Sequence, residues 1–295
     1  MQKSFLVNVN KPEGISSFAV VARLRKILNV KKIGHLGTLD PFATGVLPLA
    51  VGKATRFIQY LQPDEKEYIA EIYLGATSNT DDLTGEICKS DLDCKSLPLY
   101  ENIAEVLRSF EGEIMQMPPQ FSALKIEGKR AYALARKGEH ADLKSRKVFV
   151  KKIELQSCNW PYVGIKVVCG KGVYIRSIAR DLGELLGVGG YLTKLQRIKV
   201  GEFKIENALC LDSLSDDNID CVSIEDAWGT RPKIELTAEE WSALAQGKFI
   251  SSDFVEKFPT PVLGIFQSEA VCLLEDVASQ PGLVKSAINI KEIND

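Results

Sequence analysis

The hydrophobic positions along the chain change their spacing several times, and the changes predict both helices and strands. Residues 5–9, FLVNV, are typical of a short strand followed by a polar turn. After the turn, apolar residues recur every three or four positions as far as Leu28, which predicts a helix that Ser16 or Ser17 can cap. Residues 66–75, KEYIAEIYLG, predict another strand.

The middle of the chain repeats this mixture. We expect a short amphipathic helix over residues 103–110, and residues 147–158 and 162–170 alternate like adjacent antiparallel strands. Residues 171–187 end in a helix with one apolar face, and a last strand is expected over 199–205. Because strands and helices do not alternate regularly, the pattern predicts an α+β fold with a mixed, mainly antiparallel central sheet flanked by helices and loops.

Residues 31–52, KKIGHLGTLDPFATGVLPLAVG, fit neither pattern. The glycines and two prolines make this run too irregular for a long helix or a central strand, and it is too apolar for a plain solvated loop. We expect a structured loop in which glycine lets the backbone approach a ligand closely. Its one acidic residue, Asp40, precedes Pro41, and an aspartate there often only begins a turn, so a structural role stays open.

The composition is that of an ordinary globular protein, with 45% hydrophobic and 26% charged residues. It excludes a disordered chain, a collagen and a disulfide scaffold. The net charge of −2 argues against a nucleic-acid partner, but the charge is unevenly distributed. Residues 201–295 hold 7 basic and 18 acidic side chains, whereas residues 1–200 hold 30 basic and 21 acidic ones. A basic body is therefore masked by an acidic tail.

Several kinds of chemistry lack their sequence motifs. The seven cysteines have neither metal-site nor disulfide spacing, which is typical of a reduced cytoplasmic protein. No signal peptide or membrane span is expected, because no apolar run is long enough. His35 and His140 are the only histidines, so we expect no metal site, and no nucleotide-cofactor motif or serine-hydrolase elbow is present.

The string Gly34–Arg56, GHLGTLDPFATGVLPLAVGKATR, closely resembles the signature of the TruB family of tRNA pseudouridine synthases. Most of residues 5–205 share the resemblance. Further family motifs are matched by Lys11–Ser17 (KPEGISS), Tyr68 in KEYIAEIYLG, Asp82 in the Thr77–Gly85 loop, Ser122–Lys125 (SALK), Gly172–Arg176 (GVYIR), Asp181–Gly183 (DLG) and Leu195–Arg197 (LQR). Gln196 departs from the family pattern, which often has arginine there.

The resemblance implies a pseudouridine synthase catalytic fold over residues 1–230 and a small, diverged PUA-like module over residues 231–295. It also implies that the protein isomerises uridine 55 in the T arm of tRNA after flipping the base out of its loop. Uracil is detached from C1′, rotated and rejoined through C5. Because this involves neither a redox step nor group transfer, no cofactor is expected. The implied partner is the tRNA T-arm stem-loop, bound by a monomer.

Three catalytic residues follow from the resemblance. Ionised Asp40 supplies the nucleophile or the base that deprotonates the ribose, and a carboxylate suits attack at a sugar carbon. Tyr68, which could otherwise be an ordinary strand aromatic, stacks on the target base and is a candidate for removing the C5 proton. Arg176 begins a helix, where a cation opposes the helix dipole, so we expect an Arg176–Asp40 ion pair rather than a solvated arginine.

The same resemblance implies six substrate-binding residues. Tyr174 supports Tyr68 and the base, and Leu195, which could be a plain core leucine, packs against uracil. His35 lies near two glycines, so its ring is expected to be exposed and to stack on RNA. The set of expected substrate-binding residues is His35, Lys11, Tyr174, Leu195, Asp82 and Arg197.

Two other functions stay open. The chain could be a tRNA-binding folding chaperone in which isomerisation is secondary, although an intact catalytic set favours real catalysis. It could also modify another RNA within a guide-RNA particle, but that would call for long basic tails, which are absent here. Residues 123–199 hold 17 basic and 6 acidic side chains. We therefore expect a basic RNA-binding face around Asp40, with the acidic tail away from it.

Overall fold

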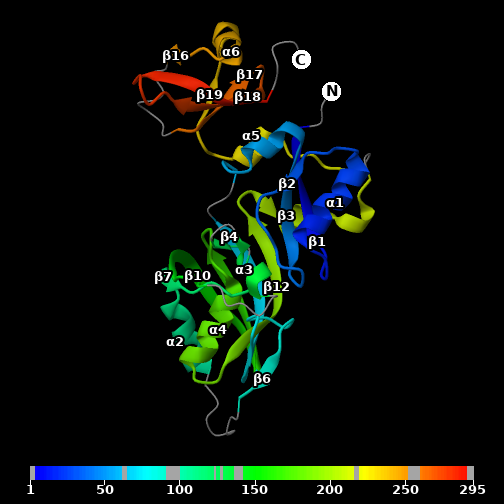
Figure 1. The fold of residues 1–295 in the computed structure, drawn as a ribbon, viewed down its shortest axis with the longest axis vertical. Coiled ribbons are helices and arrows are strands. Elements are labelled where there is room, and N and C mark those ends of the chain that lie inside the picture. Colours follow the sequence, from blue (N-terminus) through cyan, green and yellow to red (C-terminus); the bar gives the residue numbers. More distant parts are fainter. Residues whose placement is uncertain are drawn as a thin grey trace.

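The computed structural model contains two main β-sheets and several short helices (Figure 1). It describes residues 4–61, 65–90, 100–122, 124–126, 129–135, 142–215, 219–251 and 260–290. Strands and helices are interspersed along the chain, and the larger sheet has both parallel and antiparallel neighbours. The expected α+β class with a mixed sheet is confirmed.

The larger sheet has ten strands and is mainly antiparallel, because only the β1–β14 and β3–β12 pairs within it run parallel. Two of its strands lie off the main path, with β2 paired to β3 and β13 paired to β12. In spatial order the main path is β14 (Leu209–Cys210), β1 (Phe5–Lys11), β3 (Thr44–Val51), β12 (Gly190–Val200), β4 (Lys66–Leu74), β11 (Tyr162–Cys169), β10 (Arg146–Asn159) and β7 (Gly112–Gln116); the other two are β2 (Ile33–His35) and β13 (Phe203–Lys204).

Helices α2 and α4 lie side by side against the sheet, in contact with β10 and β12 respectively (Figure 1). The expected antiparallel pairing of the two long strands in the middle of the chain is confirmed by β10 and β11. The helices are α1 (Ser17–Leu28), α2 (Tyr100–Ser109), α3 (Ala131–Ala135), α4 (Ile175–Leu185), α5 (Ile224–Trp228) and α6 (Ala238–Ala245), with 3₁₀ turns η1 (Gly52–Phe57), η3 (Ile205–Asn207) and η4 (Leu211–Ser213).

Helix α1 begins and ends where the sequence predicts. The Ser16 side chain accepts a hydrogen bond from the Ala19 amide, which caps the first turn. At the other end Asn29 adopts a left-handed conformation and its amide donates to the Arg25 carbonyl. The apolar stripe packs into the core that lies under the sheet. The helix thus presents its capped N-terminus, with Ser16 and Ser17, towards the loop that carries Asp40.

The expectation that residues 31–52 contain no central strand is wrong. The segment forms β2 and then β3, which lies between β1 and β12 within the sheet. Strand β3 is buried from Gly45 to Val51, so it shows none of the alternation that marks a half-exposed strand. The carbonyl of Pro48 accepts a hydrogen bond from the Leu36 amide, on the edge of β3 that faces away from β1. The N–H that proline lacks would point to the same edge, so its absence leaves the pairing of β3 with β1 intact.

The strand expected over residues 199–205 is also placed differently. Strand β12 runs from Gly190 to Val200, and only the short β13 follows it. Of its three basic residues, Lys194 is exposed, Lys199 is half-buried and Arg197 is buried. Strand β12 pairs with β4 along most of its length, and this places Leu195 and Arg197 opposite Ala70 and Tyr68.

The C-terminal part of the chain forms a second, five-stranded sheet, which stands at the end of the molecule away from α2 and β6 (Figure 1). Apolar residues of this sheet, including Leu263 and Leu273, share a buried cluster with Phe57 and Leu61 of the body. In addition, the Tyr60 hydroxyl donates to Glu275 at 2.9 Å. The order of its strands is β15 (Lys233–Glu235), β17 (Val262–Phe266), β18 (Glu269–Asp276), β19 (Leu283–Asn289) and β16 (Ile250–Ser251).

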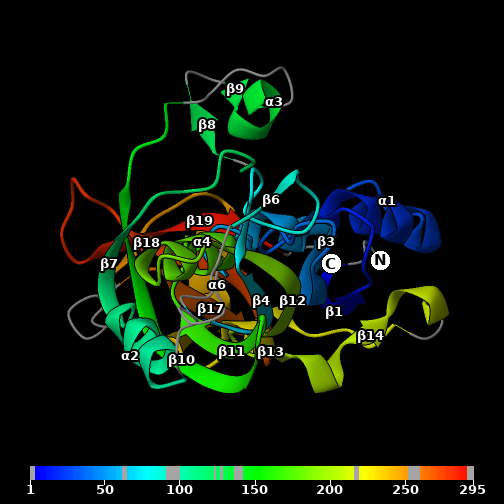
Figure 2. The same ribbon diagram turned by 90° about the horizontal axis from the view of Figure 1, so that it is seen from below.

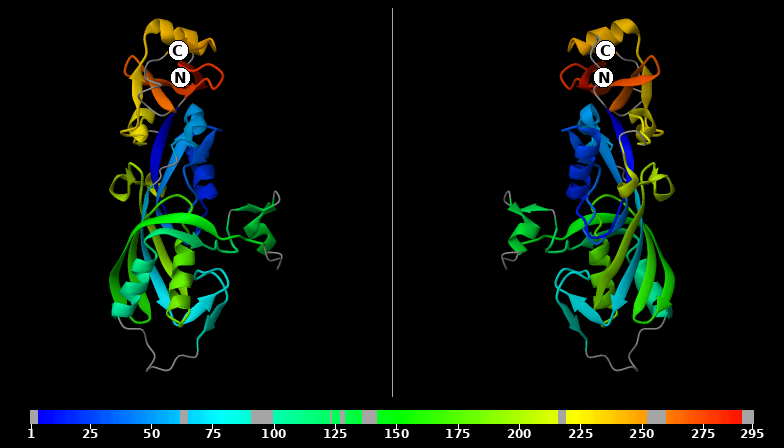
Figure 3. Two further views of the ribbon diagram at one scale, coloured as in Figure 1. Left: turned by 90° about the vertical axis from the view of Figure 1, so that its left-hand side faces the viewer. Right: turned by 90° about the vertical axis from the view of Figure 1, so that its right-hand side faces the viewer.

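An arm formed by β8 (Lys125–Ile126), β9 (Lys129–Arg130) and α3 projects from the body, as Figures 2 and 3 show from two directions. The two-stranded pair of β5 (Ala76–Ser78) and β6 (Ile87–Lys89) lies near the base of the arm (Figure 2). None of the helices in the described part of the chain has the length and apolar character needed to cross a bilayer.

Candidate functional site

Two pockets meet at Asp40 and Arg176. The larger one, of about 1020 Å³, reaches from the N-terminus of α1 to the base of the arm. The smaller one, of about 230 Å³, opens between the Asp40 loop, β4, β12 and the start of α4. Among the described residues, those that line either pocket all lie between Ser16 and Arg197, so the described part of the acidic tail lines neither pocket. The smaller pocket is lined by Gly37, Thr38, Leu39, Asp40, Lys66, Tyr68, Arg146, Gly172, Val173, Tyr174, Ile175, Arg176, Leu195 and Arg197.

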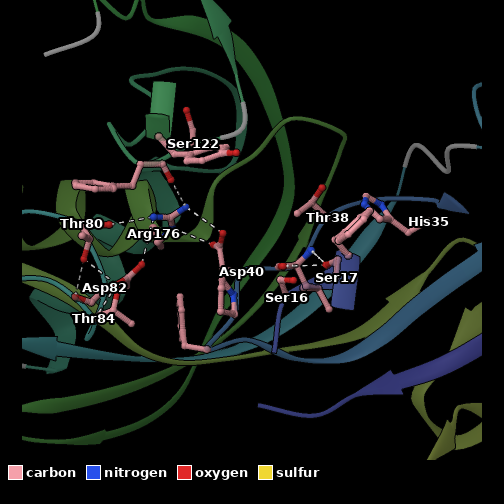
Figure 4. A pocket seen from close by; sticks show the side chains of 16 residues that line it. Ser16, Ser17, His35, Thr38, Asp40, Thr80, Asp82, Thr84, Ser122 and Arg176 are labelled. Carbon is pink, nitrogen blue, oxygen red and sulfur yellow. Dashed lines mark hydrogen bonds and ion pairs between the residues drawn. The ribbon is translucent and has the colours of Figure 1, made fainter. Parts of the chain in front are cut away.

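The expected Arg176–Asp40 ion pair is confirmed. The Arg176 Nη2 donates to Asp40 Oδ1 at 3.2 Å, and Nε lies 3.0 Å from Oδ2, so the guanidinium faces the carboxylate edge to edge. Arg176 is 4% exposed and Asp40 is 33% exposed. The cation is therefore enclosed, while the carboxylate is partly open to the pockets. Figure 4 shows the two side chains pointing toward each other.

Arg176 also holds the loop before β6. Its Nη1 donates to Asp82 Oδ2 at 3.2 Å and to the Thr80 carbonyl at 3.1 Å. The other Asp82 oxygen accepts from the Thr80 hydroxyl at 2.7 Å and from the amide and hydroxyl of Thr84. Arg176 Nη2 further donates to the Phe121 carbonyl at 2.9 Å, at the base of the arm. One guanidinium thus joins three segments that lie far apart in the sequence.

The environment of Asp40 opposes its charge. Burial raises the pKa of the Asp40 carboxyl above its ordinary value, and the neighbouring Asp82 carboxylate raises it further. The Arg176 guanidinium and, to a lesser degree, the Lys11 ammonium act in the opposite direction. Arg176 therefore favours the ionised form of Asp40 against the effect of burial.

The backbone of the Asp40 loop is held by cations that have no carboxylate partner there. Arg197, 1% exposed, donates from Nε, Nη1 and Nη2 to the carbonyls of Val46, Thr38 and Gly37 at 2.8, 3.4 and 3.0 Å. The fully buried Lys11 donates to three carbonyls, among them Pro41 at 3.0 Å. Except for Val46, which lies in β3, these carbonyls belong to residues outside the strands, and buried carbonyls need donors.

Lys11 and Arg197 therefore act in this structure on the loop rather than at its surface. Burial lowers the pKa of Lys11 to about 8, although Asp40 opposes the change, and its three carbonyl acceptors match the three donors of an ammonium group. Direct substrate contact by Lys11 stays a prediction. Arg197 also lines the smaller pocket.

Ser17 fixes the residue before Asp40. Its hydroxyl donates to the Leu39 carbonyl at 2.9 Å and accepts from the Leu39 amide at 2.8 Å. Both atoms of Leu39 are thereby satisfied without a strand neighbour. Ser16 caps helix α1, and Ser17, the next residue, connects the helix to the Asp40 loop. The larger pocket opens along this contact (Figure 4).

Tyr68 and Leu195 line the smaller pocket from neighbouring strands, and each is 8% exposed. The Tyr68 hydroxyl takes part in a hydrogen bond with Arg197. Burial raises the pKa of Tyr68 above its ordinary value, against the effect of Arg197, so the hydroxyl stays protonated at neutral pH. An aromatic ring, a leucine and a carboxylate at one small pocket suit a flat, uncharged ring with a sugar attached.

Tyr174, the N-cap residue of α4, lies in the same pocket and is held by two side chains: Gln116, which the sequence analysis did not single out, and Arg146, which it placed only in the basic stretch expected to bind RNA. Gln116, 1% exposed, accepts from the Tyr174 amide at 2.8 Å and donates to the Tyr174 carbonyl at 3.1 Å. The Arg146 guanidinium carbon lies 5.0 Å from the centre of the Tyr174 ring. Neither contact could be found in the sequence, because both depend on how β7 and β10 pair beside α4.

His35 lines the larger pocket from β2, but its ring is half-buried rather than fully exposed. Its Nδ1 is buried and has no hydrogen-bond partner in the described part of the chain. Burial lowers the pKa of His35, and Arg197 lowers it further, so the ring is neutral at pH 7. Stacking on RNA stays a prediction for this residue.

Family models match most of the body of the chain. Residues 25–175 match the model described as the TruB family pseudouridylate synthase N-terminal domain. Residues 176–222 match the model described as the tRNA pseudouridylate synthase B C-terminal domain. The two matched ranges meet at Arg176, so the residues that form both pockets lie almost entirely within them.

Curated proteins are similar over most of the chain. A protein of Clostridium tetani named tRNA pseudouridine synthase B is 42% identical over 78% of this chain and 80% of its own length. Proteins with the same name from Ehrlichia ruminantium and Gloeothece citriformis are 47% and 49% identical, each over 70% of this chain and over 70% and 68% of their own lengths.

Solved structures agree at lower identity. The structure of an H/ACA RNP bound to a substrate RNA containing 2′-deoxyuridine has a TM-score of 0.73 at 27% identity. A Cbf5–Nop10–Gar1 complex gives 0.72 at 28%, and in both cases the match covers 98% of this chain and 86% of the other. The shared fold, the family-model matches and the identity to the curated proteins agree: the chain belongs to the TruB family and is a pseudouridylate synthase.

Proposed function

We propose that this enzyme isomerises uridine 55 in the T arm of tRNA, with Asp40 as the catalytic carboxylate. The observation that carries the proposal is the open edge of Asp40, held by Arg176, at a small pocket that Tyr68 and Leu195 also line. The curated proteins that are 42–49% identical are all named for tRNA. These names support tRNA as the substrate RNA, and we propose its T-arm stem-loop as the part that is bound.

Each residue of the smaller pocket has a role in the proposed reaction. Asp40 attacks the ribose C1′ or takes a ribose proton, and the C1′–N1 bond breaks. The uracil ring turns between Tyr68 and Leu195, and C5 bonds to C1′ as Asp40 leaves C1′ or returns the ribose proton. The C5 proton is then removed, with Tyr68 as the candidate group that takes it; because its hydroxyl is protonated at neutral pH, Tyr68 gives up its own proton in exchange, and one proton is added at N1. Atoms are conserved, and no cofactor takes part.

Arg176 favours the ionised form of Asp40 and aims it at the pocket, and Asp82 with the Thr80 carbonyl fixes Arg176 in turn. A uridine inside a folded T loop reaches this pocket only after the base is flipped out. His35 and the arm are placed at the larger pocket, where they can contact the nucleotides around the flipped base. The basic excess of residues 123–199 supports binding of the RNA backbone.

The test uses an unmodified tRNA transcript and no other RNA or protein. Pseudouridine is mapped nucleotide by nucleotide after incubation with the wild type, with Asp40→Ala and with Asp212→Ala. Asp212 is an exposed aspartate paired with Arg23, so its replacement matches the chemical change away from the pockets. We expect product at position 55 from the wild type and from Asp212→Ala, and none from Asp40→Ala.

Other outcomes separate the alternatives. No product at position 55 from the wild type would refute the assignment of substrate. Product from Asp40→Ala would remove Asp40 from its role. Activity that appears only when a guide RNA is added would favour a role within a guide-RNA particle.

A further inference from the structure

Four cations line the smaller pocket, and three of them are engaged elsewhere. Arg176 binds Asp40, Asp82 and two carbonyls, and Arg197 binds three carbonyls and Tyr68. Lys66 interacts with other protein groups. The fourth is Arg146, the first residue of β10, which no motif of the sequence analysis singled out for the pocket.

Arg146 is fixed in place but only partly satisfied. Its Nη2 donates to the Gly172 carbonyl at 2.6 Å, and its guanidinium lies over the Tyr174 ring. Its Nε is buried and has no hydrogen-bond partner in the described part of the chain. The described residues provide no carboxylate for it, and Nη2 to Gly172 is the one hydrogen bond they give it.

The position of Arg146 is set by the fold on both sides. It pairs with Gln116 in the β10–β7 ladder, and Gln116 holds the backbone of Tyr174. The carbonyl that receives its hydrogen bond belongs to Gly172, whose φ of +88° favours glycine. A Cβ added there would lie 3.6 Å from the Arg146 guanidinium. The fork is thus oriented before any ligand arrives.

The Arg146 guanidinium is oriented and has no carboxylate partner among the described residues. At a pocket for a nucleotide, its charge and shape match the phosphate group of that nucleotide. Planar guanidinium forks bind phosphate oxygens in pairs, and a partly enclosed charge is screened less by salt than one at the surface. The uracil and ribose of the substrate carry no anion that could take this role.

We propose that Arg146 binds a phosphate group flanking the target uridine and so anchors the flipped nucleotide at the smaller pocket. The inference rests on the proposed function and adds a residue to it. In this view the contact with the Tyr174 ring orients the cation, and the contact with the phosphate holds the sugar beside Asp40.

The test is a double-mutant cycle that combines a change in the protein with a change in the RNA. The affinity for a T-arm stem-loop is measured for the wild type and Arg146→Gln, with an ordinary RNA and with RNAs in which one flanking phosphate, 5′ or 3′, is an uncharged methylphosphonate. Lys147→Gln is the matched control, because Lys147 follows in sequence, is exposed and pairs with Glu113. Arg146→Lys keeps the charge and loses the fork.

We expect Arg146→Gln to weaken binding of ordinary RNA about tenfold. The slope of log affinity against log salt concentration should become shallower by about 1, which corresponds to the loss of one phosphate contact. One of the two methylphosphonates should weaken wild-type binding by a similar factor and leave Arg146→Gln unchanged. Lys147→Gln should keep its affinity within about twofold, and Arg146→Lys should lie between wild type and Arg146→Gln.

Two outcomes would overturn the inference. If Arg146→Gln is folded, judged by its thermal unfolding, and lowers kcat while affinity and salt slope stay as in the wild type, Arg146 only positions Tyr174. If both methylphosphonates weaken the wild type and Arg146→Gln equally, the phosphate is bound by another residue. Failure of the wild type to make pseudouridine in the same stem-loop would instead refute the proposed function.

Discussion

Two buried arginines, Arg176 and Arg197, contact the same loop in different ways. Arg176 faces carboxylates on two sides, Asp40 and Asp82, whereas Arg197 binds backbone carbonyls of the loop and of β3, together with the Tyr68 hydroxyl. A buried cation beside carboxylates sets their charge, and a buried cation beside carbonyls sets the path of a backbone. The first region therefore controls the chemistry of Asp40, and the second controls its position.

The largest effect should come from removing the cation between the two carboxylates. Arg176→Met leaves Asp40 and Asp82 enclosed without their partner, so we expect a loss of about 3–5 kcal/mol in the free energy of unfolding. Turnover of a tRNA transcript should fall on the order of 10²- to 10³-fold. Urea unfolding and single-turnover kinetics measure the two effects.

Arg176→Lys separates charge from geometry at this position. Lysine restores the charge but not the fork that reaches Asp40, Asp82 and two carbonyls together. It should recover more stability than turnover. Equal recovery of both would mean that the fork is unimportant.

A smaller effect is expected from the carbonyl region. Arg197→Met leaves the carbonyls of Gly37, Thr38 and Val46 without their donor, which should lower the free energy of unfolding by about 2–4 kcal/mol. Turnover should fall about 10²-fold, because the loop shifts. If Arg197→Met shifts the acid limb of the kcat/KM pH profile as far as Asp82→Asn does, Arg197 also acts on the charge of Asp40, and the contrast between the two arginines is wrong.

The contact between α1 and the loop gives a matched pair of neighbouring serines. Ser17→Ala leaves the Leu39 amide and carbonyl unsatisfied, and we expect a loss of about 1–3 kcal/mol together with lower turnover. Ser16→Ala removes only the helix cap, so it should lose about 1 kcal/mol and keep most of its turnover. If the two variants lose turnover equally, Ser17 does not position the loop.

The smallest effect is a shift in pH dependence. Because burial and Asp82 raise the pKa of Asp40, and the ionised form is required, kcat/KM should fall as the pH drops through this raised pKa. Asp82→Asn removes the neighbouring negative charge, so the acid limb should move to lower pH. Asp81→Asn is the control, since Asp81 pairs with Arg180 instead. An acid limb that moves to higher pH in Asp82→Asn would contradict the assignment.

The helix caps and half-exposed strands could be predicted from the sequence, because their signals lie within a few residues. Ser16 and Asn29 bound α1 through local hydrogen bonds, and β4 alternates along its own length. Strand β3 could not be predicted, since it is buried on both faces and holds Pro48. Only its neighbours in the sheet make that arrangement favourable.

The motifs of the sequence by themselves determined which groups the site would contain, including Asp40, Tyr68 and Arg176. The tertiary structure decided what holds them: Gln116 at the backbone of Tyr174, Arg146 over its ring, and Arg197 beneath the Asp40 loop. Asp40 and Arg176 are 136 residues apart, and the two contacts of Tyr174 cross from β7 and β10 to α4. Local preferences extend over a few residues, whereas these contacts exist only once the sheet has set the register of its strands.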